Sequence, residues 1–182
     1  MAEKLAALGE QVLSPKGWER HQLEVAAFWE RLRVILLETI EKELGTAAWE
    51  RLRIYQDGLP IGREGARRIV EELAESGSAN YQIVKELLER GAAIEKTEHV
   101  DLLQEEYRLI RNIVAAPGPA DKAEAEQAYR RRSEPLLAAR DQFIAKRIDE
   151  SLKETELGLL FIGASHRVIS YLPKDIEVVS VS

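Results

Sequence analysis

The sequence predicts an α/β protein, predominantly helical, built as a single domain around a small and mostly parallel β-sheet. Apolar residues recur at helical spacing along most of the chain, while three short runs break this period and are rich in apolar or β-branched residues. Runs that are apolar on both faces are typical of parallel strands covered by helices. At 182 residues the chain suits one domain with a substantial core better than two. We therefore expect one domain over residues 1–182.

The first predicted helix covers residues 23–44. Its apolar residues form one face, which we expect to point into the core: Val25, Phe28, Leu32, Ile35, Leu36 and Ile40. A short β-like run follows at residues 52–55 and ends in QDGLP, which is typical of a turn. A strand and then a new helix are therefore expected after the first helix.

Two shorter amphipathic helices are predicted over residues 64–76 and 79–90. Ser78 is a suitable N-cap for the second of them, and Gly91 is a suitable stop. A strand over residues 92–94 would be too short to predict from its pattern.

A long helix over residues 97–115 carries an apolar stripe at alternating steps of three and four: Val100, Leu103, Tyr107, Ile110 and Val114. The stretch AAPGPA ends this helix because its two prolines cannot continue it, and we expect an interhelical turn there. The last helical region covers residues 121–153, with a new start at Pro135 and Ser133 as its cap.

The last two strands are predicted at residues 158–163 and 176–181, the second from the β-branched run IEVVSV. The first of these strands ends in GASH. Ligands bind beyond the carboxyl ends of strands in an open parallel sheet. Gly163 and Ser165 would let a ligand come close, and His166 would offer a base, a metal ligand or a hydrogen-bond donor. The alternative is a tight turn followed by a solvated histidine.

The strand at residues 52–55 also ends in polar residues, Gln56 and Asp57. If the two strands are parallel, Asp57 and His166 line the same edge of the sheet. An ordinary Asp-Gly turn is the alternative for Asp57.

Two charged residues interrupt the apolar stripe of the last helix. The stripe runs through Leu137, Ile144 and Ile148, and its missing step is occupied by Arg140 and Asp141. A charge on the inward face of a helix needs a partner, because an unpaired buried ion is very costly. One interpretation is a structural ion pair, and the other is an arginine placed at the strand ends to bind an anionic group.

Two other charged stretches give weaker signals. Acidic residues surround His99 in EHVDLLQEE, and their spacing is typical of a solvated helix face rather than of a metal site. GLPIGREG follows a strand and precedes a helix, but it lacks the standard phosphate-loop patterns, and Pro60 has no amide to donate. Arg63, Arg67 and Arg68 leave anion binding at this loop as a minor hypothesis.

Composition narrows the classes of function. The absence of cysteine excludes disulfides, thiolate metal sites and cysteine nucleophiles, and the net charge of −6 argues against a nucleic-acid partner. No run approaches the ~18 apolar residues of a membrane helix. The start, MAEKLAALGEQ, is helical in pattern and unlike a signal peptide. We expect a cytoplasmic protein that binds neither nucleic acid nor membrane.

Three C-terminal stretches, RDQFIAKRI, LFIGASHRV and IEVVSV, together resemble the C-terminal part of the TraB, ChaN and erythromycin-esterase-like group. The resemblance implies an α/β fold. In the TraB branch, two G-x-x-H motifs are thought to contribute to a metal-dependent hydrolytic site. Gly163–His166 would be the second motif, and Arg140–Asp141 would match the arginine-led helix motif. The group's first motif lies on an N-terminal strand, for which the helical pattern at the start of this chain offers no equivalent.

Two functions of different classes follow from these observations. The first is a hydrolase-like protein with a ligand or metal site at the strand ends, in which His166 is a base or metal ligand and Arg140 contacts an anionic group or other small molecule. Its cofactor is left open, and a divalent metal is one candidate. The remaining expected site residues are Asp57 and Asp141 as supporting carboxylates and Gly163, Ser165 and Gln56 as ligand contacts.

The second function is a non-catalytic binding or assembly protein that keeps the fold without a complete active site. A homo-oligomer would then cover the sheet edge that a missing strand leaves open.

Overall fold

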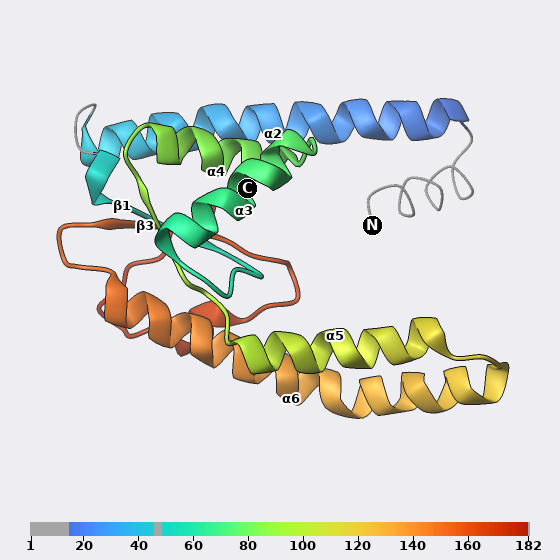
Figure 1. Ribbon diagram of the computed structural model, residues 1–182. Helices are drawn as coiled ribbons and strands as arrows, with labels where there is room; N and C mark the ends of the chain where they lie inside the picture. The colour runs from blue at the N-terminus through green and yellow to red at the C-terminus, as the bar shows by residue number, and fades with distance from the viewer. Residues whose placement is uncertain (1–14, 46–48, 182) are drawn as a thin grey trace.

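The computed structural model describes residues 15–45 and 49–181 (Figure 1). The five α-helices among these residues are α2 (Pro15–Leu44), α3 (Arg63–Glu75), α4 (Ala79–Glu89), α5 (Val100–Ala115) and α6 (Pro119–Ser151). The strands are β1 (Leu52–Gln56), β2 (Ala93–Glu95) and β3 (Leu157–Phe161), and the short 3-10 helices are η1 (Trp49–Arg51) and η2 (Val168–Tyr171). The predicted single α/β domain, mainly helical around a small sheet, is confirmed.

The sheet has three parallel strands in the order β2-β1-β3. β1 lies in the centre, with Leu52 opposite Leu157 and Arg53 opposite Ala93. The predicted strand at residues 176–181 is wrong, because no strand forms there and residues 177–181 make no backbone hydrogen bond to another described backbone group. The third strand is instead β2, whose pattern was too short to predict.

Helices cover both faces of the sheet. Leu52 and Ile54 of β1 point into a core formed with α2, α3 and α4, while Tyr55 points the other way into a smaller core with Ile144 and Ile148 of α6. Figure 1 shows the two layers, with α2 and α4 on one side of the strands and α6 on the other. Four of the five residues of β1 are buried because helices cover both of its faces.

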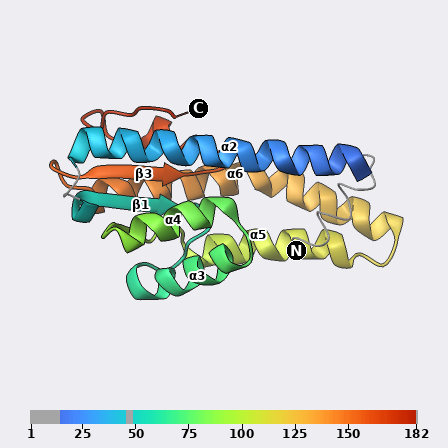
Figure 2. The same cartoon turned by 90° about the horizontal axis from the view of Figure 1, so that it is seen from above.

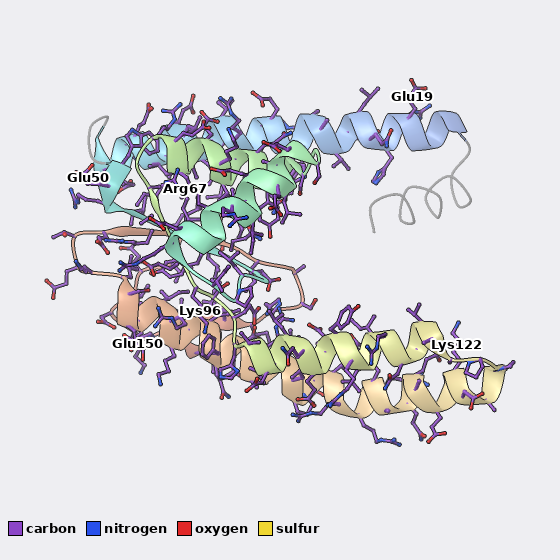
Figure 3. The ribbon with its side chains drawn as sticks, in the orientation of Figure 1. Glu19, Glu50, Arg67, Lys96, Lys122 and Glu150 are labelled. Carbon is purple, nitrogen blue, oxygen red and sulfur yellow. The ribbon has the colours of Figure 1, made fainter. Side chains whose placement is uncertain are left out.

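Two arms project from this body in the same direction: the N-terminal half of α2, and the α5–α6 hairpin (Figures 1 and 2). Glu19 and Lys122 mark their far parts in Figure 3. The predicted inward face of the first helix is therefore only partly inward, since Leu36 and Ile40 are buried while three other members are exposed: Val25, Phe28 and Ile35. The apolar stripe predicted on α5 is likewise mostly exposed to solvent. Its exposed residues are Val100, Tyr107, Ile110 and Val114.

The ends of the long helices follow the sequence with two exceptions. α2 begins at Pro15 rather than at the predicted residue 23. α5 ends at Ala115 and α6 begins at Pro119, so the predicted turn between them is confirmed. The new start predicted at Pro135 is wrong, because α6 continues through this exposed proline. Ser133 lies inside the helix, where its hydroxyl donates to the carbonyl of Arg130 at 3.5 Å.

Within residues 15–45 and 49–181, no helix combines the length and the apolar character needed to cross a membrane. The helical pattern of MAEKLAALGEQ falls outside the described part of the chain.

Candidate functional site

Four of the charged residues singled out in the sequence meet at one edge of the sheet. Asp57 follows β1, His166 follows β3, and Arg140 and Asp141 lie on α6, which packs under both strands. Because β1 and β3 are parallel, their carboxyl ends lie side by side, and the Asp57 amide donates to the Phe161 carbonyl at 2.9 Å. The topology therefore brings together residues that are far apart in the sequence.

His166 is held by Asp141. Its Nδ1 lies 2.5 Å from Asp141 Oδ1, and the second oxygen of Asp141 accepts from the backbone amide of Arg167 at 2.7 Å. Both side chains are almost fully buried, with 6% of His166 and 3% of Asp141 exposed. Nε2 of His166 faces Asp57, at 3.4 Å from Oδ2. An ionised carboxylate only accepts, so the hydrogen of this pair belongs on Nδ1.

Arg140 forms ion pairs with three carboxylates. Nε and Nη2 donate to Glu98, with Nη2 at 2.6 Å from Oε1. Nη1 donates to Glu106 at 2.7 Å, and Nη2 also donates to Asp57 at 2.9 Å. All three guanidinium nitrogens thus contact carboxylates of the protein. These contacts form the structural ion pair that the sequence suggested for Arg140. The positive charge of Arg140 is therefore balanced by carboxylates of the protein itself.

The cluster is rich in negative charge. It holds four carboxylates, Asp57, Glu98, Glu106 and Asp141, against one guanidinium and one imidazole. Burial raises the pKa of Glu98, and the nearby Asp57 adds to this, although Arg140 acts in the opposite direction. Burial lowers the pKa of Arg140, but the hydrogen bonds and charge of Glu98, with the charges of Glu106 and Asp57, more than offset this and raise it overall.

The three residues expected to contact a ligand differ in burial and in hydrogen bonding. Gln56 is buried, and its side chain donates to the Asp57 carbonyl at 3.3 Å and accepts from Asn80 at 3.4 Å, so it supports the strand end. Gly163 and Ser165 are exposed. The hydroxyl of Ser165 has no hydrogen bond to any residue that the structure describes. A Cβ at Gly163 would lie 3.7 Å from the His166 ring and 3.8 Å from Asp57, so a side chain at this position would contact both groups.

Sequence reasoning missed Glu98 and Glu106, which were assigned to a solvated helix face around His99. Glu98 is fully buried and precedes α5, whereas His99 is the exposed N-cap of α5 and its Nδ1 accepts from the Asp101 amide at 3.3 Å. The sequence did indicate one thing. A buried arginine requires carboxylate partners, and the acidic residues at the start of α5 could provide them.

The divalent metal considered as a candidate cofactor does not fit these residues as they are arranged. Within the described ranges, no three His, Asp or Glu side chains are placed to hold a metal ion together. The acidic side chains nearest to His166 are already bound, Asp57 by Arg140 and Asp141 by His166 itself.

Comparisons with protein-family models, with curated proteins and with solved structures give no match. The resemblance of the C-terminal stretches to the TraB, ChaN and erythromycin-esterase-like group stays a prediction. The geometry of the site carries the functional argument.

Proposed function

We propose that the carboxyl edge of β1 and β3 is a hydrolase-like site in which His166 serves as the general base. The observation that carries this proposal is the His166–Asp141 pair, in which a buried carboxylate holds Nδ1 at 2.5 Å. Such a pair orients the ring, sets its tautomer and leaves Nε2 as the nitrogen that exchanges a proton. Among the described residues Nε2 forms no hydrogen bond, and its one ion-pair contact is with Asp57, at 3.4 Å, beyond the usual length of a hydrogen bond.

The step proposed for His166 is proton transfer during attack by water. Nε2 accepts a proton from water as the water oxygen bonds to an acyl carbon of the ligand. The bond from that carbon to the leaving oxygen then breaks, and the imidazolium returns the proton to the leaving group. Asp57, of which 25% is exposed, and the exposed Gly163 form the side from which a ligand reaches His166.

The charge of the cluster favours a neutral or cationic ligand. Arg140 was expected to contact an anionic group, but its nitrogens are occupied by Glu98, Glu106 and Asp57. The surplus of carboxylates repels an incoming anion and attracts a cation. The supported ligand class is therefore an uncharged or amine-bearing ester rather than a phosphate ester.

Hydrolysis of three probes tests this proposal: p-nitrophenyl acetate, the cationic ester acetylcholine and the anionic p-nitrophenyl phosphate. We expect turnover of one or both carboxylic esters, and a fall of about a hundredfold or more in His166→Ala. His99→Ala, which removes an exposed imidazole on α5, controls for hydrolysis by surface histidines. A folded His166→Ala variant with the wild-type rate would refute the assignment, as would preference for the phosphate ester.

A second candidate function is self-assembly through the two arms, and a specific observation favours it. The apolar stripes of α2 and α5 remain outside the body, with Phe28, Tyr107 and Val114 exposed by 46%, 64% and 76%. On α2 the exposed stripe continues the buried one that holds Leu36 and Ile40. Because both uncovered stripes belong to the same chain and project in one direction, a second copy supplies apolar partners for each.

Sedimentation velocity over a wide concentration range tests the assembly. We expect the wild-type sedimentation coefficient to rise with concentration, and expect Phe28→Asp and Tyr107→Asp to remain monomeric. Val179→Asp is the matched control, since Val179 is equally apolar and 75% exposed but lies outside the arms. A wild-type protein that stays monomeric throughout would rule this function out and would leave the His166 site unaffected.

A further inference from the structure

A cavity of about 420 Å³ lies beside β2, at the edge of the sheet opposite to β3. Its walls come from β1, the first turns of α3, the end of α4 and β2, and include Arg53, Arg63, Arg67, Leu88, Ala93 and Glu95. None of these residues belongs to the carboxyl-edge cluster around His166. The volume falls in the range of small-molecule sites in proteins.

Three arginines line this cavity, and two of them have no carboxylate partner. Arg53 is paired with Glu156 at 2.5 Å and with Glu95 at 3.5 Å. Arg67 donates only to the neutral carbonyl of Leu88, at 3.4 Å, and Arg63 has no side-chain hydrogen bond or ion pair within the described ranges. Glu64 also lines the cavity but forms no ion pair with a described residue. The guanidinium groups of Arg63 and Arg67 are therefore available to a ligand.

The spacing of these two arginines suits one anionic group. Arg63 and Arg67 are four residues apart on α3, so their side chains lie on the same face of the helix. Two like charges at this spacing repel one another unless an anion lies between them. Guanidinium groups bind carboxylate and phosphate oxygens in pairs. Arg67 is labelled in Figure 3, on α3 close to the strands.

The rest of the wall is mostly apolar, with Leu88, Ala92, Ala93 and Ile94 as its aliphatic members. We propose that this cavity binds a small organic anion, with its phosphate or carboxylate on Arg63 and Arg67 and a short apolar body against these residues. This site is separate from the proposed hydrolase-like site and does not depend on it.

An NMR titration of the ¹⁵N-labelled full chain with n-butyl phosphate and with n-pentanoate tests the proposal, with n-butanol as the uncharged control. We expect at least one anion to shift the amides of Ala93 and Glu95 while that of Gly163 stays in place, and n-butanol to shift neither group. The more tightly bound anion identifies the charged group that the cavity prefers.

The decisive variants are Arg63→Gly and Arg67→Ala, each expected to weaken binding about tenfold or more. Glycine suits position 63 because its φ of +54° lies in the left-handed region, so Arg63→Gly removes the guanidinium without straining the backbone. Arg68→Ala is the matched control, since Arg68 lies on α3 but does not line the cavity. Absence of binding by both anions at millimolar concentration would overturn the proposal. So would an equal loss in Arg68→Ala, which would indicate unspecific attraction.

Discussion

Arg140 is the residue through which the sheet edge, α5 and α6 are joined. It lies on α6 and binds Asp57 after β1, Glu98 before α5 and Glu106 within α5. Glu98 is fully buried, so its charge is stabilised by Arg140 rather than by water. The stability of the site and the position of Asp57 therefore depend on this one side chain.

Replacing Arg140 by alanine is expected to destabilise the fold strongly. The change leaves Glu98 buried without its cation, and loss of one partner of a buried pair costs about 3–5 kcal/mol. Urea unfolding measures the difference. Arg132→Ala is the control, because Arg132 pairs with Glu105 on the surface and its loss should change stability little. Similar effects of the two substitutions would show that the Glu98 pair is not a stabilising contact.

Glu98 should make the fold less stable as the pH rises. Burial raises its pKa above the ordinary value of 4.5, although Arg140 opposes this. A carboxyl whose pKa is raised in the folded state contributes stability that is complete below the ordinary pKa and is lost as pH rises through the folded-state pKa. The free energy of unfolding of wild type minus that of Glu98→Gln should therefore fall as the pH rises from about 4.5 towards neutral.

Urea unfolding across this pH range gives the difference. Glu105→Gln is a control of opposite sign, because Arg132 lowers the pKa of Glu105, so its contribution is lost on acidification instead. A difference for Glu98→Gln that is constant with pH would contradict the prediction.

At the residue scale, the sequence allowed part of the cluster to be predicted. The rule that ligands bind beyond the carboxyl ends of parallel strands pointed to Asp57 and His166, and the interrupted apolar stripe pointed to Arg140 and Asp141. Glu98 could not be found in the same way. Whether an acidic residue before a helix is solvated or buried depends on what packs against it, and only the tertiary structure brings α6 there.

At the element scale, helices were predicted better than strands. The period of apolar residues is a local property, and the helices begin and end near the predicted positions, except that α2 begins at Pro15 rather than at residue 23. A strand, however, is stable only when it is paired. The run IEVVSV has the composition of a strand but no partner among the described strands, whereas the weak segment Ala93–Glu95 pairs with β1 and becomes β2.

Replacing Pro135 by alanine should stabilise α6. Proline inside a helix removes one backbone hydrogen bond and costs up to about 3 kcal/mol relative to alanine. Pro135 is exposed, so alanine there creates no cavity. Pro119→Ala is the control, because Pro119 is at the first helical position, where proline is well tolerated. Urea unfolding of both variants tests this, and a gain that is equal in both would show that position within α6 is irrelevant.

At the scale of the whole molecule, the body and the arms should differ in local stability. The α2 residues from Glu19 to Phe28 are all exposed, whereas β1 is buried between helices. Elements with few buried apolar contacts open more readily. The amphipathic patterns of α2 and α5 showed which faces are apolar, but a pattern within one chain does not say what covers a face.

Hydrogen exchange measures this difference in local stability. In dilute protein, amides of residues 19–28 are expected to exchange at least about a hundredfold faster than those of β1. Protection of residues 19–28 that increases with concentration would agree with assembly through the arms. Equal protection of the arm and of β1 in dilute protein would contradict the prediction.

The central place of β1 also has a consequence for the newly made chain. Leu52 pairs with Leu157, so one side of β1 has no partner until β3 has been synthesised. At ~5–20 residues per second, ribosomes take several seconds to add the intervening segment. An open strand edge is a template for pairing with other chains. The α5–α6 hairpin can fold on local contacts during this time. β1 keeps an unpaired edge until β3 is made, and this edge leaves the nascent protein vulnerable to aggregation.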